Sequence, residues 1–304
     1  MLYFAKEGKF VNFRKFLTEV QSIRDYEGKS ISEKSLNEIK TFLESINTSI
    51  AGKESFSFRI FEKGIDVFNK LEGVGGYSGI MIKSPHYIGL LINDNRAKTE
   101  FLGAYYMQSI VKKLYDMDLG SCWIDIKDVS KEIKAELSNG NEDVNYLLAF
   151  GNINKKALKE KSRTLKVQSG GSYKTNPYGA KATVTDTDTS RLSLSEIAFL
   201  YEWGKEISYD DLQMRGLEDL FLYIRNAPSY KNKQPSRFII KDGEAQLAVI
   251  NPHNRQNIID AGIMMYTFEG MTKELGIPSS WHCTYGDKET FSEKEYAILA
   301  EISL

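Results

Sequence analysis

The sequence predicts an α+β protein built from two related units that are joined by a long polar connection. Three observations support this prediction. The segment at 102–123 aligns without a gap with the segment at 260–281. Helical and β-like runs flank both segments in the same order. The stretch between the units, residues 167–192, is rich in Gly, Ser, Thr, Asp and Asn and has no apolar periodicity.

The repeated segments are LGAYYMQSIVKKLYDMDLGSCW and DAGIMMYTFEGMTKELGIPSSW, whose alignment places Met107 on Met265 and Trp123 on Trp281. Apolar residues recur every three or four positions in both, which is typical of an amphipathic helix. Each segment therefore predicts a helix, a short turn and an extended segment that begins at Trp. Two unrelated amphipathic helices could share this pattern by coincidence, but the common order of the flanking elements favours duplication.

Each unit is expected to contain one earlier helix and two further β-like runs. In the first unit the helix spans 31–46 and the runs 55–61 and 146–151; in the second unit the helix spans 212–225 and the runs 236–243 and 296–303. Ser32 is the expected N-cap of the first helix, with a contact between Ile31 and Leu36. The predicted boundaries are residues 1–163 for the first unit, 164–190 for the linker and 191–304 for the second, shorter unit.

Composition excludes several classes of function. The chain has 41% hydrophobic and 27% charged residues and a net charge of −1, so it offers no overall field that would attract nucleic acid or an anionic membrane. We find no apolar run of about 18 residues and no signal peptide, and expect a cytoplasmic protein. The two cysteines, Cys122 and Cys283, and the three histidines, His86, His253 and His282, have no metal-ligand spacing. No metal site and no thiol nucleophile are therefore expected.

The loop NAPSYKNKQPSRFII, residues 226–240, holds two of the six prolines of the chain. Pro228 is expected to end the preceding helix, because the residue before a proline is disfavoured in the α region. Asn232 and Gln234 add amide donors and acceptors to a backbone that Pro228 and Pro235 restrict. A capped turn and a rigid binding surface both fit these residues.

The same loop resembles the "APSxxNxQP" loop of the nitroreductase family, the FMN-dependent NAD(P)H oxidoreductases, with Ser236 where the family usually has an aromatic residue. Three segments of the first unit are similar to the same family. QSIRDY, at 21–26, resembles the Ser/Arg segment that contacts the flavin phosphate, although Val20 and Gln21 stand where the family has arginine. GSCWIDI, at 120–126, resembles the segment along the flavin ring, and KSR, at 161–163, resembles the Lys-x-Arg that closes over the phosphate.

The resemblance implies a nitroreductase-like fold with mainly antiparallel sheets flanked by helices, packed through central helices at 99–118 and 257–275. It also implies FMN as cofactor, NADH or NADPH as electron donor, and a nitroaromatic, quinone or similar small-molecule acceptor. No side chain need act as a catalytic group, since the flavin carries the chemistry; a backbone N–H near Ile124 or Asp125 would face the ring. The implied cofactor-binding residues are Ser22, Arg24, Trp123, Ile124, Asp125, Lys161, Arg163, Pro228, Ser229, Tyr230, Asn232 and Gln234, with Lys231 or Arg225 assisting at the pyrimidine edge.

The motifs are divided between the units. The first unit has the Ser/Arg segment but NTSIAGKESFSF, at 47–58, where the family loop would stand; the second has the loop but LYEWGKEISYDD, at 200–211, in place of the Ser/Arg segment. We therefore expect one composite FMN site per chain, in a monomer that forms an internal pseudo-dimer. The alternative is a non-catalytic flavin-binding or small-molecule-binding protein with the same fold. The glycines of 73–79 lack the G-x-G-x-x-G spacing and predict a turn that leads to a core strand.

Overall fold

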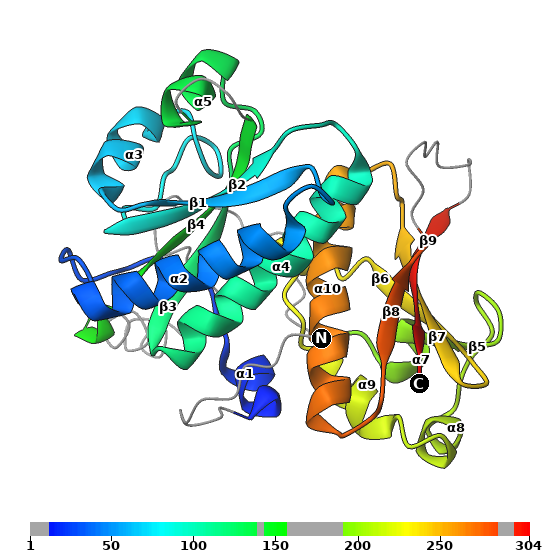
Figure 1. Cartoon of the computed structure of the whole chain (residues 1–304). Helices are drawn as coiled ribbons and strands as arrows, with labels where there is room; N and C mark the ends of the chain where they lie inside the picture. Colours follow the sequence, from blue (N-terminus) through cyan, green and yellow to red (C-terminus); the bar gives the residue numbers. More distant parts are fainter. Residues whose placement is uncertain (1–11, 139–142, 157–190, 285–294) are drawn as a thin grey trace, which may run out of the picture.

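The structure is a computed structural model that describes residues 12–138, 143–156, 191–284 and 295–304. The chain forms two antiparallel sheets whose flanking helices meet between them (Figure 1). The elements before the connecting segment are α1 (Phe13–Glu19), α2 (Glu33–Ile50), β1 (Phe56–Phe61), α3 (Gly64–Leu71), β2 (His86–Ile92), α4 (Ala97–Asp116), β3 (Leu119–Asp125), α5 (Lys131–Ser138) and β4 (Asp143–Asn152). Those after it are α7 (Leu194–Ile197), β5 (Ala198–Leu200), α8 (Tyr209–Met214), α9 (Glu218–Ile224), η1 (Tyr230–Asn232), β6 (Ser236–Lys241), β7 (Glu244–Ile250), α10 (Arg255–Glu274), β8 (Ser280–Cys283) and β9 (Tyr296–Ser303).

The two sheets have the same strand order. The first runs β1-β2-β4-β3 and the second β5-β6-β7-β9-β8, so that β6, β7, β9 and β8 take the places of β1, β2, β4 and β3. Both also break register at the same place. Pairing skips Asn145 in β4 opposite Leu90 and Leu91, and skips Leu299 in β9 opposite Leu247 and Ala248. A duplication, as the sequence predicts, would produce this correspondence.

Within the described residues, strand β5 has no counterpart in the first sheet. It pairs in parallel with β6, with Ala198 opposite Phe238 and Leu200 opposite Ile240. Because α7 and β5 are the first described elements after the connecting segment, the chain enters the second half at the edge of its sheet. The other described strand pairs of both sheets are antiparallel, as expected.

The central helices α4 and α10 cross between the two sheets (Figure 1). They correspond to the helices predicted at 99–118 and 257–275, and each begins and ends one or two residues earlier than predicted. A Cβ on Gly262 would lie 2.2 Å from the backbone oxygen of Phe101, so only glycine permits this approach. The rings of Tyr105 and Tyr266 lie 5.6 Å apart, and the Tyr105 hydroxyl donates to the Glu269 carboxylate. The methionines of these helices are buried in the core, and the tyrosines are partly buried and pack against it.

Local signals explain where several helices begin. The Ser32 hydroxyl accepts a hydrogen bond from the Ser35 N–H at 3.1 Å and caps α2, and Ile31 and Leu36 are both buried. The single helix predicted at 212–225 is wrong: the structure has two short helices, α8 and α9. Gly216, at φ +67°, separates them, because this left-handed conformation cannot continue an α-helix.

His86 is the first residue of β2 and is buried. Its Nε2 accepts from the Ile31 N–H at 3.2 Å, so Nδ1 carries the proton and donates to the Glu62 carbonyl oxygen at 2.8 Å. Burial lowers the pKa of His86. The imidazole is therefore a neutral structural link between β2 and the chain before α2.

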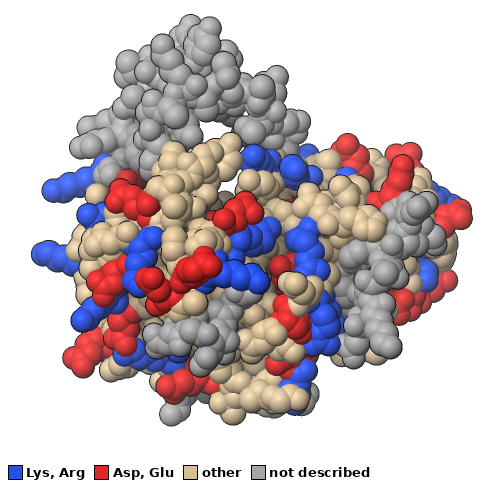
Figure 2. All heavy atoms as spheres, turned by 90° about the horizontal axis from the view of Figure 1, so that it is seen from above, with Lys and Arg blue, Asp and Glu red and all other residues tan. Residues whose placement is uncertain are grey.

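The surface shows no single large charged region on the face in Figure 2, where Lys and Arg are interspersed with Asp and Glu over the described residues. This distribution agrees with the net charge of −1. In the described part of the chain, no helix has the length and hydropathy required to span a bilayer.

Candidate functional site

Strand β3 forms the edge of the first sheet, and part of its outer edge is open among the described residues. Ser121 accepts at its carbonyl oxygen from Ile23 N–H at 2.9 Å, and Asp125 accepts at its carbonyl oxygen from Gly76 N–H at 3.2 Å. Ile126 N–H instead donates to Asn145, on the β4 side. Because backbone groups alternate between the two edges of an antiparallel strand, the N–H groups of Trp123 and Asp125 face outward.

This alternation separates the two residues expected to face a flavin ring. Asp125 has its N–H on the outer edge, whereas the N–H of Ile124 belongs to the ladder with β4. The Ile124 side chain is buried in the cluster under α3, while Trp123 packs toward the cluster between the two halves. Of the pair, only Asp125 offers a backbone donor at this edge.

The Ser/Arg segment lies at one end of the open edge. Ser22 forms a parallel bridge with Ser121. Burial raises the pKa of the Cys122 thiol, and the charge of Arg24 and a hydrogen bond with Ser22 partly oppose that shift. Both side chains therefore lie close to the start of β3. Four residues of strand, about 13 Å, separate Ser121 from Asp125.

The glycine-rich loop at 73–79 lies at the other end. Gly76 has φ +74°, and a Cβ there would lie 2.4 Å from the Ile80 carbonyl oxygen and 3.7 Å from a methyl of Ile124. The loop closes on itself through the bridge between Tyr77 and Ile80. It is a turn, as predicted, but the core strand that follows begins only at His86, because Pro85 precedes it.

The loop of Pro228 to Gln234, from the second half, has a strained backbone. Lys231, Asn232 and Gln234 have φ values of +52°, +56° and +47°. Residues other than glycine rarely adopt this conformation, and each instance costs on the order of 1 kcal/mol. Such strain persists only where surrounding contacts enforce it, and these contacts were not visible in the sequence.

Arg191 and Leu192 provide part of that support. The Arg191 guanidinium donates to the carbonyl oxygens of Asn226 and Ala227 at 3.1 and 2.9 Å and to Asn232 Oδ1 at 3.0 Å. The Leu192 N–H donates to Gln234 Oε1 at 3.1 Å. Burial and the neighbouring Arg225 lower the pKa of Arg191. The amide oxygens of Asn232 and Gln234 thus hold the loop in shape, a role that sequence analysis did not assign.

Asp260 of α10 holds the same loop through a hydrogen bond to its backbone. Its carboxylate accepts from the Tyr230 N–H at 3.0 and 3.1 Å. Burial raises the pKa of Asp260 to about 7, although the Tyr230 hydrogen bond opposes the shift. Lys127, which follows β3, also acts on this carboxyl group, so the end of β3 and the loop lie near each other. Sequence analysis missed Asp260 because a helix pattern does not reveal a buried carboxyl group.

Contacts between the two halves continue around the same place. The Lys231 ammonium lies 4.9 Å from the centre of the Tyr77 ring. Arg255 of α10 forms an ion pair with the buried Glu100 of α4 at 2.8 Å. The loop of the second half and the open edge of β3 therefore lie on two sides of the 73–79 loop.

Donors at this edge fit a flat heteroaromatic group better than a metal. Among the described residues, the Trp123 indole N–H and the Tyr146 hydroxyl are buried without a hydrogen-bond partner, and their rings lie 6.2 Å apart. Unpartnered buried donors and an outward N–H suit ring nitrogen and carbonyl acceptors. Over the described residues, no cluster of His, Cys, Asp and Glu could hold a metal ion.

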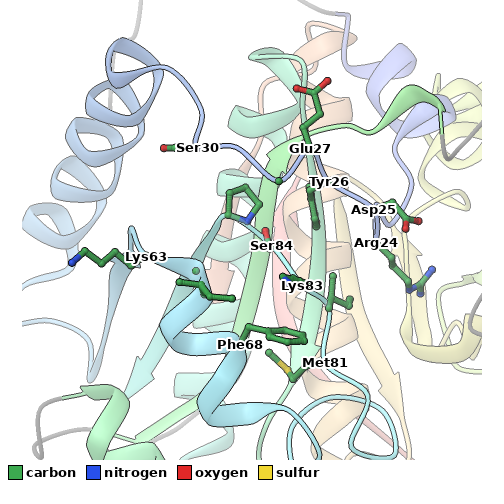
Figure 3. A pocket seen from close by; sticks show the side chains of 15 residues that line it. Arg24, Asp25, Tyr26, Glu27, Ser30, Lys63, Phe68, Met81, Lys83 and Ser84 are labelled. Carbon is green, nitrogen blue, oxygen red and sulfur yellow. The ribbon is translucent and has the colours of Figure 1, made fainter.

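A cavity of about 630 Å³ lies on the α3 side of the first sheet. Figure 3 shows Phe68 and Met81 together inside it, while Lys63, Glu27 and Arg24 point outward in different directions. The cavity shares Arg24 with the Ser/Arg segment. Its wall residues Met81 and Ile82 belong to the cluster under α3, so it lies on the face of the sheet away from the loop of the second half.

The structure places the expected site residues in two groups. Ser22, Arg24, Trp123 and Asp125 follow the open edge of β3, with Ile124 turned inward. The second group, in the loop before β6, comprises Pro228, Ser229, Tyr230, Asn232 and Gln234. Lys231 reaches the first half, whereas Arg225 donates to the Arg191 carbonyl oxygen within the second half. Lys161 and Arg163 lie outside the described residues.

Comparison with known proteins adds a family match. A family model described as "Putative TM nitroreductase" matches residues 12–188, more than half of the 304 residues. No curated protein matches the chain.

Solved structures with similar folds include a "putative nitroreductase" from Thermotoga maritima. It has a TM-score of 0.55 and 14% sequence identity, with 99% of this chain and 97% of that chain covered. At this identity the likeness concerns the fold. A "putative nitroreductase in complex with FMN" from Desulfovibrio desulfuricans has a TM-score of 0.37 and 14% identity over 49% of this chain and 88% of that chain. An NADPH:FMN oxidoreductase from Vibrio harveyi, complexed with NAD⁺, has a TM-score of 0.35 and 15% identity over 47% and 70%.

Proposed function

The chain belongs to the nitroreductase family described by that model, and from this premise we propose that it is an FMN-dependent oxidoreductase. NADH or NADPH would supply the electrons, and a nitroaromatic, quinone or similar small molecule would accept them. The flavin, when bound, supplies the electron-transfer chemistry. The residues of the chain bind it, orient it and exclude water.

One observation carries this proposal: the open edge of β3, in the first half, lies next to the strained loop of the second half. The outward N–H of Asp125 stands between the Ser22 bridge and the Gly76 contact. In the proposal, this N–H donates to the nitrogen edge of the ring, and Trp123 lies beside it. The loop from Pro228 to Gln234 covers the ring from the other half.

Arg24 and Ser22 would hold the phosphate, because a guanidinium and a hydroxyl both donate to phosphate oxygens. Lys161 and Arg163 remain predicted contacts of the same phosphate. The amide oxygen of Asn232 is bonded to Arg191 at 3.0 Å. Asn232 and Gln234 would therefore act chiefly through the shape of the loop.

The proposal includes one site per chain. The matching edge strand of the second sheet, β8, has no bridge to another segment on its outer side within the described residues. The first half also has no equivalent of the proline-containing loop before β1. Each half would thus supply one part of a single site, in a chain that works as an internal pseudo-dimer. The unit boundaries at 163 and 191 belong to this proposal.

FMN titration of the purified full chain tests the proposal. We expect saturation at one FMN per chain and FMN-dependent oxidation of NADH or NADPH with a quinone or nitroaromatic acceptor. Arg24→Ala should weaken FMN binding about tenfold, since it removes a charged phosphate contact. Asn232→Gly, which keeps the left-handed backbone but loses the Arg191 bond, should weaken it about threefold.

Two matched variants serve as controls. Arg215→Ala removes a partly exposed arginine that pairs with Asp242 at 2.9 Å, and Asn251→Gly alters an asparagine with φ +47° in another turn. Neither should change FMN affinity. Two FMN per chain would refute the single site, and unchanged affinity in both site variants would refute the residue assignment. FMN binding without turnover of any acceptor would instead favour a non-catalytic flavin-binding protein.

A further inference from the structure

Two exposed tyrosines from different halves of the chain face one ammonium group. The Lys231 Nζ lies 4.9 Å from the centre of the Tyr77 ring and 5.2 Å from that of Tyr230. The tyrosines are 62% and 37% exposed. A cation is attracted to the face of each ring. The three side chains therefore meet at the surface where the two halves join.

Backbone contacts fix this group beside the open edge of β3. Gly76, which precedes Tyr77, donates its N–H to the Asp125 carbonyl oxygen at 3.2 Å. On the other side, the Tyr230 N–H donates to the Asp260 carboxylate. The two rings are thus held in position by their backbones, while large parts of them stay accessible to a ligand.

Among the residues that the structure describes, the charges around this group leave an excess of positive charge. Lys127 forms an ion pair with Asp125 at 3.2 Å, and Asp260 lies buried beneath Tyr230. Lys231 and Lys233, by contrast, have no carboxylate within ion-pair distance among the described residues. Lys231 also has a left-handed backbone at φ +52°, a conformation that non-glycine residues rarely keep without supporting contacts.

We propose that Tyr77, Tyr230 and Lys231 form an entrance subsite that selects planar aromatic ligands bearing an anionic group. Such a ring stacks on a tyrosine and displaces the ammonium from it, after which Lys231 pairs with the anion. A neutral aromatic gains only the stacking. Two sources share this chemistry: an aromatic acid that accepts electrons, and the nicotinamide nucleotide that donates them. The redox role of the subsite rests on the proposed function, whereas ligand binding does not.

Calorimetric titration of the full chain, with and without added FMN, tests the subsite. The probes are 4-nitrobenzoate and nitrobenzene, which differ in the anionic group. Wild type should bind 4-nitrobenzoate more tightly. Lys231→Asn tolerates the left-handed backbone and should weaken 4-nitrobenzoate about fivefold while changing nitrobenzene by less than about twofold. Tyr77→Leu should weaken both probes about threefold.

Lys205→Asn is the matched control, because Lys205 lies 5.5 Å from the centre of the Tyr201 ring, elsewhere in the second half. It should change neither affinity. The proposal would be overturned if Lys231→Asn weakened both probes equally, or if Lys205→Asn weakened 4-nitrobenzoate as much as Lys231→Asn does. Equal affinity of wild type for the two probes would also overturn it.

A second set of titrations with NADH and NADPH identifies the source of the ligand. A loss with Lys231→Asn for 4-nitrobenzoate but not for the nucleotides assigns the subsite to the acceptor, and a loss for 4-nitrobenzoate and for the nucleotides extends it to the donor. A failure to bind FMN would refute the proposed function separately, because the calorimetric comparison of the two nitro compounds does not require the flavin.

Discussion

The two halves share a strand order but differ in what connects their first two strands. Between β1 and β2 the chain inserts α3, the 73–79 loop and part of the wall of the cavity in Figure 3. Between β6 and β7 it makes a hairpin, with Lys241 paired to Glu244 and Gly243 at φ +76°. The insertion brings Gly76 and Tyr77 to the edge strand β3. The hairpin brings nothing to β8.

The central helices differ in the same sense. In the gapless alignment, Leu102 of α4 matches Asp260 of α10, and only Asp260 reaches a neighbouring loop. The sheets are thus alike where they form core and different where they meet the candidate site. The asymmetry between the two halves therefore lies in loops and single side chains, whereas the sheets and central helices are alike.

The largest expected effect comes from the crossing of the central helices. Gly262→Ala should lower the free energy of unfolding by about 3 kcal/mol, because the new Cβ would meet a backbone oxygen that cannot easily move. Gly103→Ala, on the other helix, meets only the end of the Leu90 side chain at 2.9 Å. It should stay within about 1 kcal/mol of wild type, since alanine favours the helix. Urea denaturation measures the free energy of unfolding of both variants. Equal losses of stability would contradict the prediction and show that the helices can move apart at Gly262.

The next effect concerns the pH dependence of stability at Asp260. Its pKa is about 7 in the folded chain, against about 3.9 in an unfolded chain. The folded chain therefore holds an extra proton between these values, and the free energy of unfolding decreases as pH rises from about 4 to about 7.

Asp260→Asn is neutral at every pH and should remove this dependence. Denaturation at several pH values gives the free energy of unfolding of wild type and variant. The wild-type value minus the variant value should decrease as pH rises to about 7 and then stay constant. Buried Glu100, whose pKa burial also raises, is present in both proteins and does not affect the difference. Asp242→Asn, at an exposed carboxylate with a lowered pKa, is the control. A difference that does not vary with pH would contradict the assignment.

The smallest expected changes in stability and FMN affinity concern Trp123 and Trp281, which match in the alignment of the two halves. The indole N–H groups of Trp123 and Trp281 are both buried without a hydrogen-bond partner in the described part of the chain. Replacement by Phe removes an unpaired donor at some loss of packing, so both variants should unfold within about 1 kcal/mol of wild type. In the proposed site, only Trp123→Phe should weaken FMN binding, by about threefold. Equal effects on FMN affinity in the two variants would contradict the single-site proposal.

The sequence predicted the framework well because periodicity and caps are local signals. The pattern of α2 and its Ser32 cap, the two central helices and the runs that form β1, β4, β6 and β9 are all present in the structure. The helix predicted at 212–225 failed because apolar periodicity continues across Gly216, although the backbone does not.

The site was harder to predict because its geometry depends on contacts between distant residues. The bond from Arg191 to Asn232 spans 41 positions, and that from Tyr230 to Asp260 spans 30. The outward N–H of Asp125 follows from strand register, which motif similarity does not specify. The family loop indicated where to look but not the residues that hold it.

The crossing of α4 and α10 within one chain has a consequence for how the protein behaves on dilution. In an assembly of separate subunits, an interface like this one dissociates as the protein concentration falls. Here the two partners are covalently joined, so their association does not depend on how many molecules are in solution. A site formed where the two halves meet would therefore remain complete in a single isolated molecule.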